Sequence, residues 1–153
     1  MPDKKIALKK LEAFLMEHLP LARAAGICVD EYTGNKLVVS APLDKNINDK
    51  GTAFGGSLYN LCVITAWGMT DLKAKELGLK GDIVVAKGEI NYLRPLKGRL
   101  VASVTSPIEE ELVHIEKSYK SRGKAIFNLD VTVLDEQLKP CVKFHGKYAV
   151  LAS

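Results

Sequence analysis

A helix-length segment that is apolar on nearly every side constrains this chain most. It begins just after two adjacent glycines, Gly55 and Gly56, and the pattern predicts a helix over residues 57–77 that Gly78 ends. A helix that is apolar all round must be covered all round. About 20 residues at 1.5 Å each make it roughly 30 Å long, enough to cross a small domain. We therefore expect a central helix surrounded by the rest of the chain.

Six β-type runs supply the cover for this helix. Residues 125–133 alternate between apolar and mixed side chains, which is the period of a strand with one buried face. Short joints connect most of the runs, and short joints suit antiparallel neighbours. The expected strands lie within residues 27–32, 36–43, 82–93, 98–106, 124–134 and 140–151.

The remaining segments complete an α+β chain. Leucines at helical spacing predict an amphipathic helix over residues 3–18, which Pro20 closes. Residues 106–123 are too long for a hairpin loop, and we expect a short surface helix there. No repeat or linker divides residues 1–153, so one domain is expected. Either the sheet curls around the central helix and a second copy completes it across a dimer, or the helix packs on a flat sheet under the N-terminal helix. The pattern slightly favours the curled sheet.

Composition limits the classes of function. A formal charge of +4 and a pI near 8.9 suit an acidic small molecule or an acidic carrier protein, and are too weak to argue for nucleic acid. The three cysteines are scattered without CxxC spacing, which favours reduced packing residues over disulfides or a metal site: Cys28, Cys62 and Cys141. No signal-peptide core or bilayer-length apolar stretch is found. We expect a soluble cytoplasmic protein without a membrane partner.

The two glycines offer a place for an anionic oxygen. The first backbone N–H groups of a helix lack intrahelical partners, and the helix dipole adds positive potential there. Gly55 and Gly56 carry no side chain, so a thioester carbonyl that becomes an oxyanion or enolate can approach closely. Removing one such donor typically costs on the order of 100-fold in rate. Alternatively, the glycines only make a tight entry capped by Ser57 or Thr52, and the residues alone favour this alternative.

Three segments carry a resemblance to a known family. They are APLDKNINDKGTAFGGSLYNLCVITAWGM at residues 41–69, GDIVVAKGEINYLRP at 81–95 and FHGKYAV at 144–150. They resemble the bacterial YiiD C-terminal thioesterase family over nearly the whole chain. The resemblance implies the hotdog fold, in which an antiparallel sheet wraps a long central helix and dimers place the site between subunits. Some relatives decarboxylate malonyl-acyl carrier protein to the acetyl form that primes fatty-acid synthesis, and their active-site asparagine corresponds to Asn48.

Hydrolysis of a thioester needs an activated water or a carboxylate nucleophile. Many hotdog thioesterases carry a carboxylate one or two turns into the helix, but residues 61–64 here contain no acid. Asp49 can act as a base if it points into the site; as a solvated turn residue beside Lys50 it cannot. Hotdog dehydratases use a catalytic histidine, and none lies in this motif; the three histidines are His18, His114 and His145.

Decarboxylation needs less from the protein. The N–H groups of Gly55 and Gly56 can stabilise an enolate, and the neutral amide of Asn48 can orient a malonyl group without repelling its carboxylate. Asn48 can instead be a turn or cap residue, and without the resemblance the residues favour this alternative. Further expected substrate contacts are Asn46, Phe54 and Ser57. Asn91 and Tyr92 can reach a partner's site, although Tyr92 is more typical of core.

A basic cluster can dock the substrate. Acyl chains arrive on phosphopantetheine, as part of coenzyme A or of an acidic carrier protein, so no separate cofactor is expected. No metal is expected either, because the Asp, Glu and His residues never cluster at ligand spacings. The cluster is Lys117, Lys120, Arg122 and Lys124, and a solvated basic loop is an equal alternative. The sequence thus supports a homodimeric malonyl-acyl carrier protein decarboxylase first, a thioesterase second and a non-catalytic acyl-carrier-binding module third. Pairing of dimers into tetramers stays open.

Overall fold

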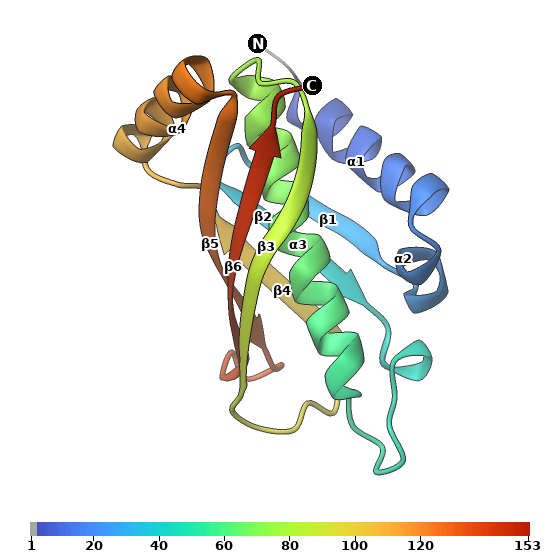
Figure 1. The fold of residues 1–153 in the computed structure, drawn as a ribbon. Coiled ribbons are helices and arrows are strands. Elements are labelled where there is room, and N and C mark those ends of the chain that lie inside the picture. The colour runs from blue at the N-terminus through green and yellow to red at the C-terminus, as the bar shows by residue number, and fades with distance from the viewer. Residues whose placement is uncertain (1–2) are drawn as a thin grey trace.

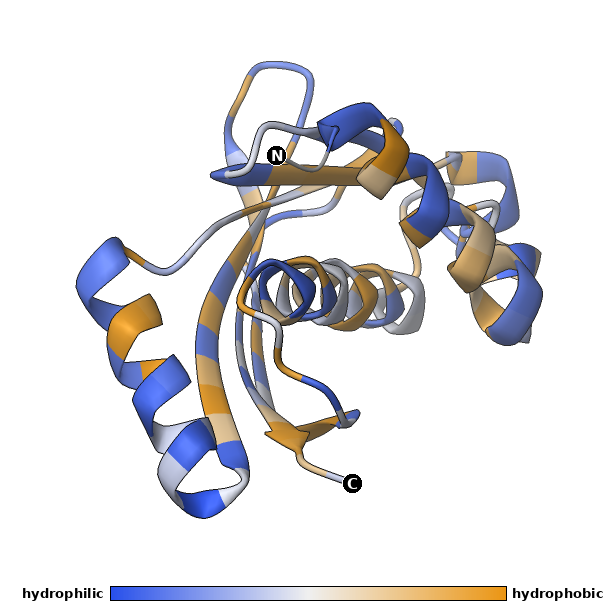
Figure 2. Ribbon diagram, turned by 90° about the horizontal axis from the view of Figure 1, so that it is seen from above, coloured by the Kyte–Doolittle hydropathy of each residue, from blue (hydrophilic) through white to orange (hydrophobic). Residues whose placement is uncertain are grey.

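One antiparallel sheet curls around one long helix in the computed structural model, which describes residues 3–153 (Figure 1). The six strands follow the order β1-β2-β4-β5-β6-β3. Seen from above, the sheet bends around the end-on helix α3 (Figure 2), so the predicted curled sheet and central helix are confirmed. The elements are α1 Lys4–His18, α2 Pro20–Ala25, β1 Cys28–Tyr32, β2 Lys36–Ala41, η1 Leu43–Lys45, α3 Gly55–Glu76, β3 Asp82–Tyr92, β4 Leu100–Thr105, α4 Glu109–Arg122, β5 Lys124–Leu134 and β6 Pro140–Leu151.

The central helix α3 begins two residues earlier than predicted. Phe54 is its N-cap in an extended conformation, with φ −68° and ψ 134°, and both glycines already lie in the helix. No side chain caps α3, so the expected cap by Ser57 or Thr52 is wrong. The helix starts where the extended backbone ends, without a capping side chain to mark the place in the sequence.

The core lies between α3 and the inner face of the sheet. The alternating residues of β5, from Ala125 to Val133, are at most 1% exposed, which confirms the predicted period of two. Leu61, Cys62 and Met69 of α3 are equally buried. Burying large apolar side chains contributes roughly 1.5–3 kcal/mol each, so this contact fixes the position of α3.

The other helices differ in part from the predicted ones. Asp3 caps α1 by accepting a hydrogen bond from the N–H of Lys5 at 2.8 Å. Pro20 closes α1, but it also opens a second, unpredicted helix, α2, because proline suits the first helical turn. The expected short surface helix is α4, with 14 residues.

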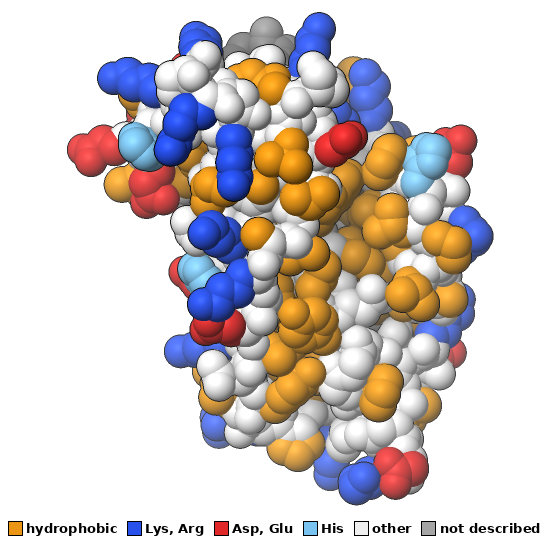
Figure 3. Space-filling model, in the orientation of Figure 1, with side chains coloured by type: hydrophobic (Ala, Val, Ile, Leu, Met, Phe, Trp, Pro, Cys, Tyr) orange, Lys and Arg blue, Asp and Glu red, His pale blue; other side chains and the backbone are white. Residues whose placement is uncertain are grey.

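The sheet has two edges, and they are covered differently. α1 packs on the short edge strand β1. The other edge strand, β3, has 11 residues and none of them is buried. Figure 3 shows hydrophobic side chains gathered along this strand. A long exposed apolar edge invites pairing with another strand.

Within residues 3–153, no helix combines the length and the apolarity needed to cross a membrane.

Candidate active site

A small loop carries the polar run to the start of α3. Ile47 and Ala53 form an isolated antiparallel bridge, and the N–H of Phe54 donates to the carbonyl of Asn46 at 2.8 Å. The N–H of Ala53 donates to the carbonyl of Leu96, also at 2.8 Å. These bonds fasten the loop to the segment after β3, so the polar residues lie beside the first turn of α3.

Asn46 anchors this loop to the residues that precede it. It is 3% exposed, and its Nδ2 donates to the carbonyls of Ala25 at 2.9 Å and Pro42 at 2.7 Å. A buried amide with both hydrogens bonded serves the loop, so the expected substrate contact of Asn46 finds no support in its position.

Asn48 holds the turn of the same loop. Its Oδ1 accepts from the N–H groups of Lys50 at 2.8 Å and Thr52 at 3.0 Å. Its Nδ2 donates to Oγ1 of Thr52 at 2.8 Å and lies 3.5 Å from the carbonyl oxygen of Ala53. The second contact is at the limit of a hydrogen bond. One amide hydrogen is therefore held loosely, although Asn48 itself is not among the residues that line the cleft described below.

The first turn of α3 presents free donors. Among the described residues, the N–H groups of Gly55, Gly56 and Ser57 have no hydrogen-bond acceptor, and no side chain caps the helix. The glycines lie between two half-exposed aromatic rings: a Cβ on Gly55 would lie 3.5 Å from the ring of Tyr92, and one on Gly56 would lie 2.5 Å from the ring of Phe54. The site therefore combines backbone donors with an apolar surround.

Tyr92 ties the end of β3 to this turn. Its hydroxyl donates to the carbonyl of Gly55 at 2.8 Å, and the residue is 52% exposed. The expectation that Tyr92 belongs to the core is therefore wrong, because its ring borders a cleft. Burial raises the pKa of Tyr92, so the hydroxyl remains a donor at neutral pH.

The cleft has a volume of about 360 Å³ and lies between α3 and the segment that follows β3. Among the described residues, those that line it include no Asp, Glu or His, and Arg94 supplies a positive charge. The sequence did not predict that Arg94 lines the cleft or that the hydroxyl of Tyr92 bonds to α3. The run NYLRP at residues 91–95 was the one feature that could have indicated them. The cleft is lined by Thr52, Ala53, Gly55, Leu58, Tyr92, Leu93, Arg94, Pro95 and Leu96.

The interior of α3 offers no base or nucleophile in its second and third turns. Leu61, Cys62 and Ile64 are buried, and the carbonyl of Val63 accepts from the hydroxyl of Tyr148 at 2.8 Å. Burial raises the pKa of the Cys62 thiol to about 12. A thiol with this pKa stays protonated at neutral pH and is inert, as the sequence suggested.

Other ionisable candidates lie outside the cleft. The side chain of Asp49 is 81% exposed and pairs with Lys50 at 3.1 Å, which places it in solvent. Nδ1 of His145 lies 2.7 Å from Oδ1 of Asp130, between strands β6 and β5. His18 and His114 lie on α1 and α4. Residues 3–153 contain no group of three or more His, Cys, Asp or Glu placed to hold a metal ion, and all three cysteines are free.

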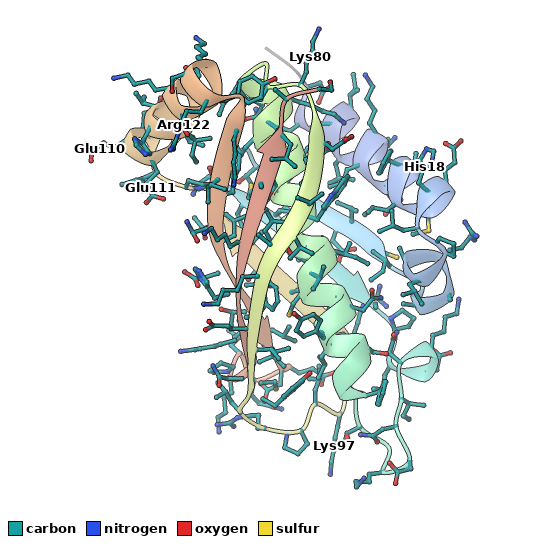
Figure 4. All side chains as sticks on the ribbon, viewed as in Figure 1. His18, Lys80, Lys97, Glu110, Glu111 and Arg122 are labelled. Atoms are coloured by element: carbon teal, nitrogen blue, oxygen red, sulfur yellow. The ribbon has the colours of Figure 1, made fainter. Side chains whose placement is uncertain are left out.

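The predicted basic cluster lies at the other end of the molecule. Lys117, Lys120, Arg122 and Lys124, here named the α4 patch, occupy the last turns of α4 and the first residue of β5, so the alternative of a basic loop is wrong. Figure 4 labels Arg122 at the upper end and Lys97, near the start of α3, at the lower end. The 22 residues of α3 separate the two ends by about 33 Å. Within one chain the patch and the glycines do not form one site.

A second cleft of about 360 Å³ lies between α1 and the C-terminal part of α3. Its charges are balanced: three lysines face three carboxylates, and Lys75 pairs with Asp71 at 3.0 Å. It therefore offers an anionic group less attraction than the helix start does.

Comparison with known proteins agrees with the fold. The profile of the family described as "Putative thioesterase (yiiD_Cterm)" matches residues 8–152. The chain belongs to this family. It is similar to a protein of unknown function from Chlorobaculum tepidum, with 39% identity, 98% of this chain and 97% of that chain covered, and a TM-score of 0.94.

Two thioesterase structures extend the comparison. A "putative thioesterase" from Shewanella oneidensis is 32% identical, with 96% of this chain and 99% of that chain covered and a TM-score of 0.86. A thioesterase from Haemophilus influenzae shares the fold at 16% identity, with 95% and 90% covered and a TM-score of 0.70. The predicted hotdog fold and family are thereby confirmed.

Proposed function

We propose that this protein is a homodimeric acyl-thioester enzyme that decarboxylates malonyl-acyl carrier protein to acetyl-acyl carrier protein. One observation carries the proposal: the N–H groups of Gly55 and Gly56 in the first turn of α3 are free, and Gly55 lines a cleft whose described lining includes no carboxylate and no imidazole. Such a site can stabilise an oxyanion but supplies no general base to a water molecule. Phosphopantetheine enters the proposal as part of the substrate.

The reaction breaks the bond between the malonyl carboxylate carbon and the α-carbon. The electron pair of that bond forms the enolate, whose negative charge lies on the thioester oxygen, and CO2 leaves. The N–H groups of Gly55 and Gly56 then donate to this oxygen, where the helix dipole also favours negative charge. A proton from water completes the acetyl group. The rings of Phe54 and Tyr92 exclude water from the departing carboxylate.

Asn48 orients the malonyl group in this scheme. Its Oδ1 is fixed by the N–H groups of Lys50 and Thr52, which sets the direction of the amide. The loosely held hydrogen on Nδ2 donates to a malonyl oxygen. Because the amide is neutral, it positions the carboxylate without stabilising its charge as strongly as a cation would.

A thioesterase is the second candidate, and the family description favours it. Hydrolysis would need the carboxylate of Asp49, which is solvent-exposed and paired with Lys50. The loop would have to turn this side chain toward the cleft. A non-catalytic module that binds acyl carriers is the third candidate.

The exposed strand β3 supports the proposed homodimer. Its inner face is apolar and only partly covered: Ile83 and Ile90 pack against the core, whereas Val85 is 48% exposed and Tyr92 is 52% exposed. A second copy related by a twofold axis can pair its own β3 antiparallel to this strand and cover both faces at once. Because Tyr92 ends β3 and borders the cleft, the active site then lies next to the dimer seam.

Two substitutions separate the three candidates when CO2 and free carrier thiol are measured together. Asn48→Ala should lower the rate by on the order of 100-fold. Thr52→Val is the matched control, because it removes the acceptor of Nδ2 in the same loop and keeps the amide. Full activity of Asn48→Ala would remove Asn48 from the mechanism. Asp49→Asn should leave CO2 release unchanged, whereas loss of thiol release in this variant would establish hydrolysis.

A further inference from the structure

The α4 patch has a fixed place relative to the start of β3. The hydroxyl of Tyr119 on α4 donates to the carbonyl of Lys80 and accepts from its N–H at 3.1 Å. Lys80 precedes β3, so these bonds join α4 to the turn between α3 and β3. Figure 4 shows Lys80 and Arg122 at the same end of the molecule.

Strand pairing gives the distance from the patch to the free edge. Lys124 of β5 pairs with Leu151 of β6, and Leu151 pairs with Asp82 of β3, so the three residues form one row across the sheet. Neighbouring strands lie about 4.8 Å apart, which places Lys124 roughly 10 Å from Asp82. Asp82 is the first residue of β3, the edge strand whose outer side has no partner among the described residues.

Antiparallel pairing of two β3 strands extends this row into the second subunit. If the 11 residues pair fully, Asp82 faces the partner's Tyr92, the residue whose hydroxyl bonds to the first turn of α3. The row from Lys124 to the partner's Tyr92 is then about 14 Å long. Within one chain the ten steps from Asp82 to Tyr92 alone cover about 33 Å along β3. The patch is therefore much closer to the partner's site than to its own.

We propose that the α4 patch of one subunit docks the acyl carrier protein for the active site of the other subunit. This inference rests on the proposed function and names its partner surface. All four cationic side chains are exposed, and they extend from the middle of α4 to the start of β5. A spread cationic surface fits the acidic surface of a protein, because complementary potentials steer the two partners together.

The charges of α4 also suit the helix itself, since Glu109, Glu110 and Glu111 lie in its first turn and cations in its last. A role confined to helix stability predicts lower thermal stability after substitution, with the Michaelis constant unchanged. A docking role predicts unchanged thermal stability and a raised Michaelis constant. Lys117 and Lys124 separate the two roles best, because neither side chain makes a hydrogen bond or ion pair within residues 3–153.

The first experiment is steady-state kinetics of Lys117→Glu/Lys124→Glu with malonyl-acyl carrier protein. The control is Lys143→Glu/Lys147→Glu, an equal change of charge on exposed residues in β6. We expect KM to rise about tenfold or more with kcat unchanged, and no rise in the control. An unchanged KM overturns the docking role. An equal rise with malonyl-coenzyme A overturns the choice of a carrier protein.

The second experiment tests whether docking occurs across subunits, with heterodimers purified through two different affinity tags. In the first heterodimer, one subunit carries Asn48→Ala and the other carries Lys117→Glu/Lys124→Glu, here named the α4 reversal. Docking across subunits leaves one complete site, so about half of the wild-type rate should remain at low substrate. In the second heterodimer, one subunit carries all three substitutions and the other is wild type. Docking across subunits then leaves no complete site, and the rate should fall to about half that of the homodimer of Lys117→Glu/Lys124→Glu.

The reverse pattern, with the second heterodimer active and the first inactive, overturns docking across subunits. That outcome leaves the proposed function intact, because the wild-type homodimer still processes the substrate. If the wild-type homodimer processes no acyl-carrier thioester, the proposed function fails instead. Carrier binding to the α4-reversed homodimer, measured by isothermal titration, then still tests the patch: weaker binding than in the control supports it, and equal binding overturns it.

Discussion

The two edge strands of the sheet both end in a tyrosine that bonds to α3, but they are exposed to different degrees. β1 has five residues and lies beside α1 (Figure 1), where Glu12 accepts a hydrogen bond from the edge N–H of Val29 at 2.7 Å. Tyr32 ends β1 and donates to Glu76 at the C-terminal end of α3. β3 is more than twice as long and has no buried residue. Tyr92 ends β3 and donates to Gly55 at the N-terminal end of α3.

From this difference in exposure we infer that the β1 edge maintains the fold, whereas the β3 edge serves the candidate site. The chain satisfies the β1 edge with its own helix, so damage there should reduce stability. It leaves the β3 edge open beside the candidate active site, so damage there should reduce assembly and rate. Each of the following predictions compares a substitution near one of the two edges with a matched substitution elsewhere.

The largest effect is expected from Val85→Lys, on the inner face of β3. A charge at the proposed dimer seam loses water without gaining a partner, so the protein should become monomeric at micromolar concentration and lose activity by on the order of 100-fold. Sedimentation velocity and turnover measure both effects. Val113→Lys is the control, since Val113 on α4 is 42% exposed against 48% for Val85. A dimeric Val85→Lys variant would show that β3 is not the seam.

Gly55→Ala should lower the rate by on the order of 100-fold with no loss of stability. The added Cβ would lie 3.5 Å from the Tyr92 ring, an ordinary contact, but beside the oxyanion donors. The counterpart ahead of β1 is Gly26→Ala. Gly26 has φ 71° and a Cβ there would lie 3.1 Å from Pro42, so about 1–2 kcal/mol of stability should be lost with the rate unchanged. Denaturant unfolding measures the stability of both variants, and steady-state kinetics measures kcat. A loss of stability in both variants, or a loss of kcat in both, would contradict this prediction.

Tyr92→Phe removes the hydroxyl that fixes Gly55 and should lower kcat about tenfold with the dimer intact. Tyr32→Phe removes the matching hydroxyl at the other end of α3. Burial raises the pKa of Tyr32, so it is a hydrogen-bond donor at neutral pH, and its loss should cost about 1 kcal/mol of stability and leave kcat unchanged. Equal kinetic effects of the two variants would remove the distinction between the edges.

The smallest effect is expected from Glu12→Ala, which removes the acceptor of the Val29 N–H on the β1 edge. The free energy of unfolding should fall by about 1 kcal/mol, with no change in the dimer or in kcat. Glu17→Ala, on an exposed part of the same helix, should stay within about 0.5 kcal/mol of wild type. A change of oligomeric state in Glu12→Ala would mean that both edges take part in assembly.

The sequence could predict the elements whose pattern is local. The alternation from Ala125 to Val133 and the apolar circumference of α3 each depend on residues within one element, and both predictions are confirmed. The start of α3 and the second helix at Pro20 were missed because no capping side chain marks the first and Pro20 serves two helices. These boundaries depend on the backbone conformation of single residues.

The geometry of the site could not be predicted in the same way. The bond from Tyr92 to Gly55 joins residues 37 positions apart, and it depends on how β3 returns along α3 after the turn at Lys80. The distance of the α4 patch from the glycines depends on the length of α3 and on the order of the strands. The residue types were recognisable in the sequence, whereas their separation is a property of the tertiary structure.

The most direct test of the proposed chemistry is to incubate the purified protein with malonyl-acyl carrier protein and weigh the intact carrier by mass spectrometry. Decarboxylation at the Gly55 site predicts conversion of the malonyl carrier to the acetyl carrier, with no free thiol. Appearance of the free-thiol carrier in place of the acetyl form would contradict it and establish a hydrolase that uses Asp49 or another base.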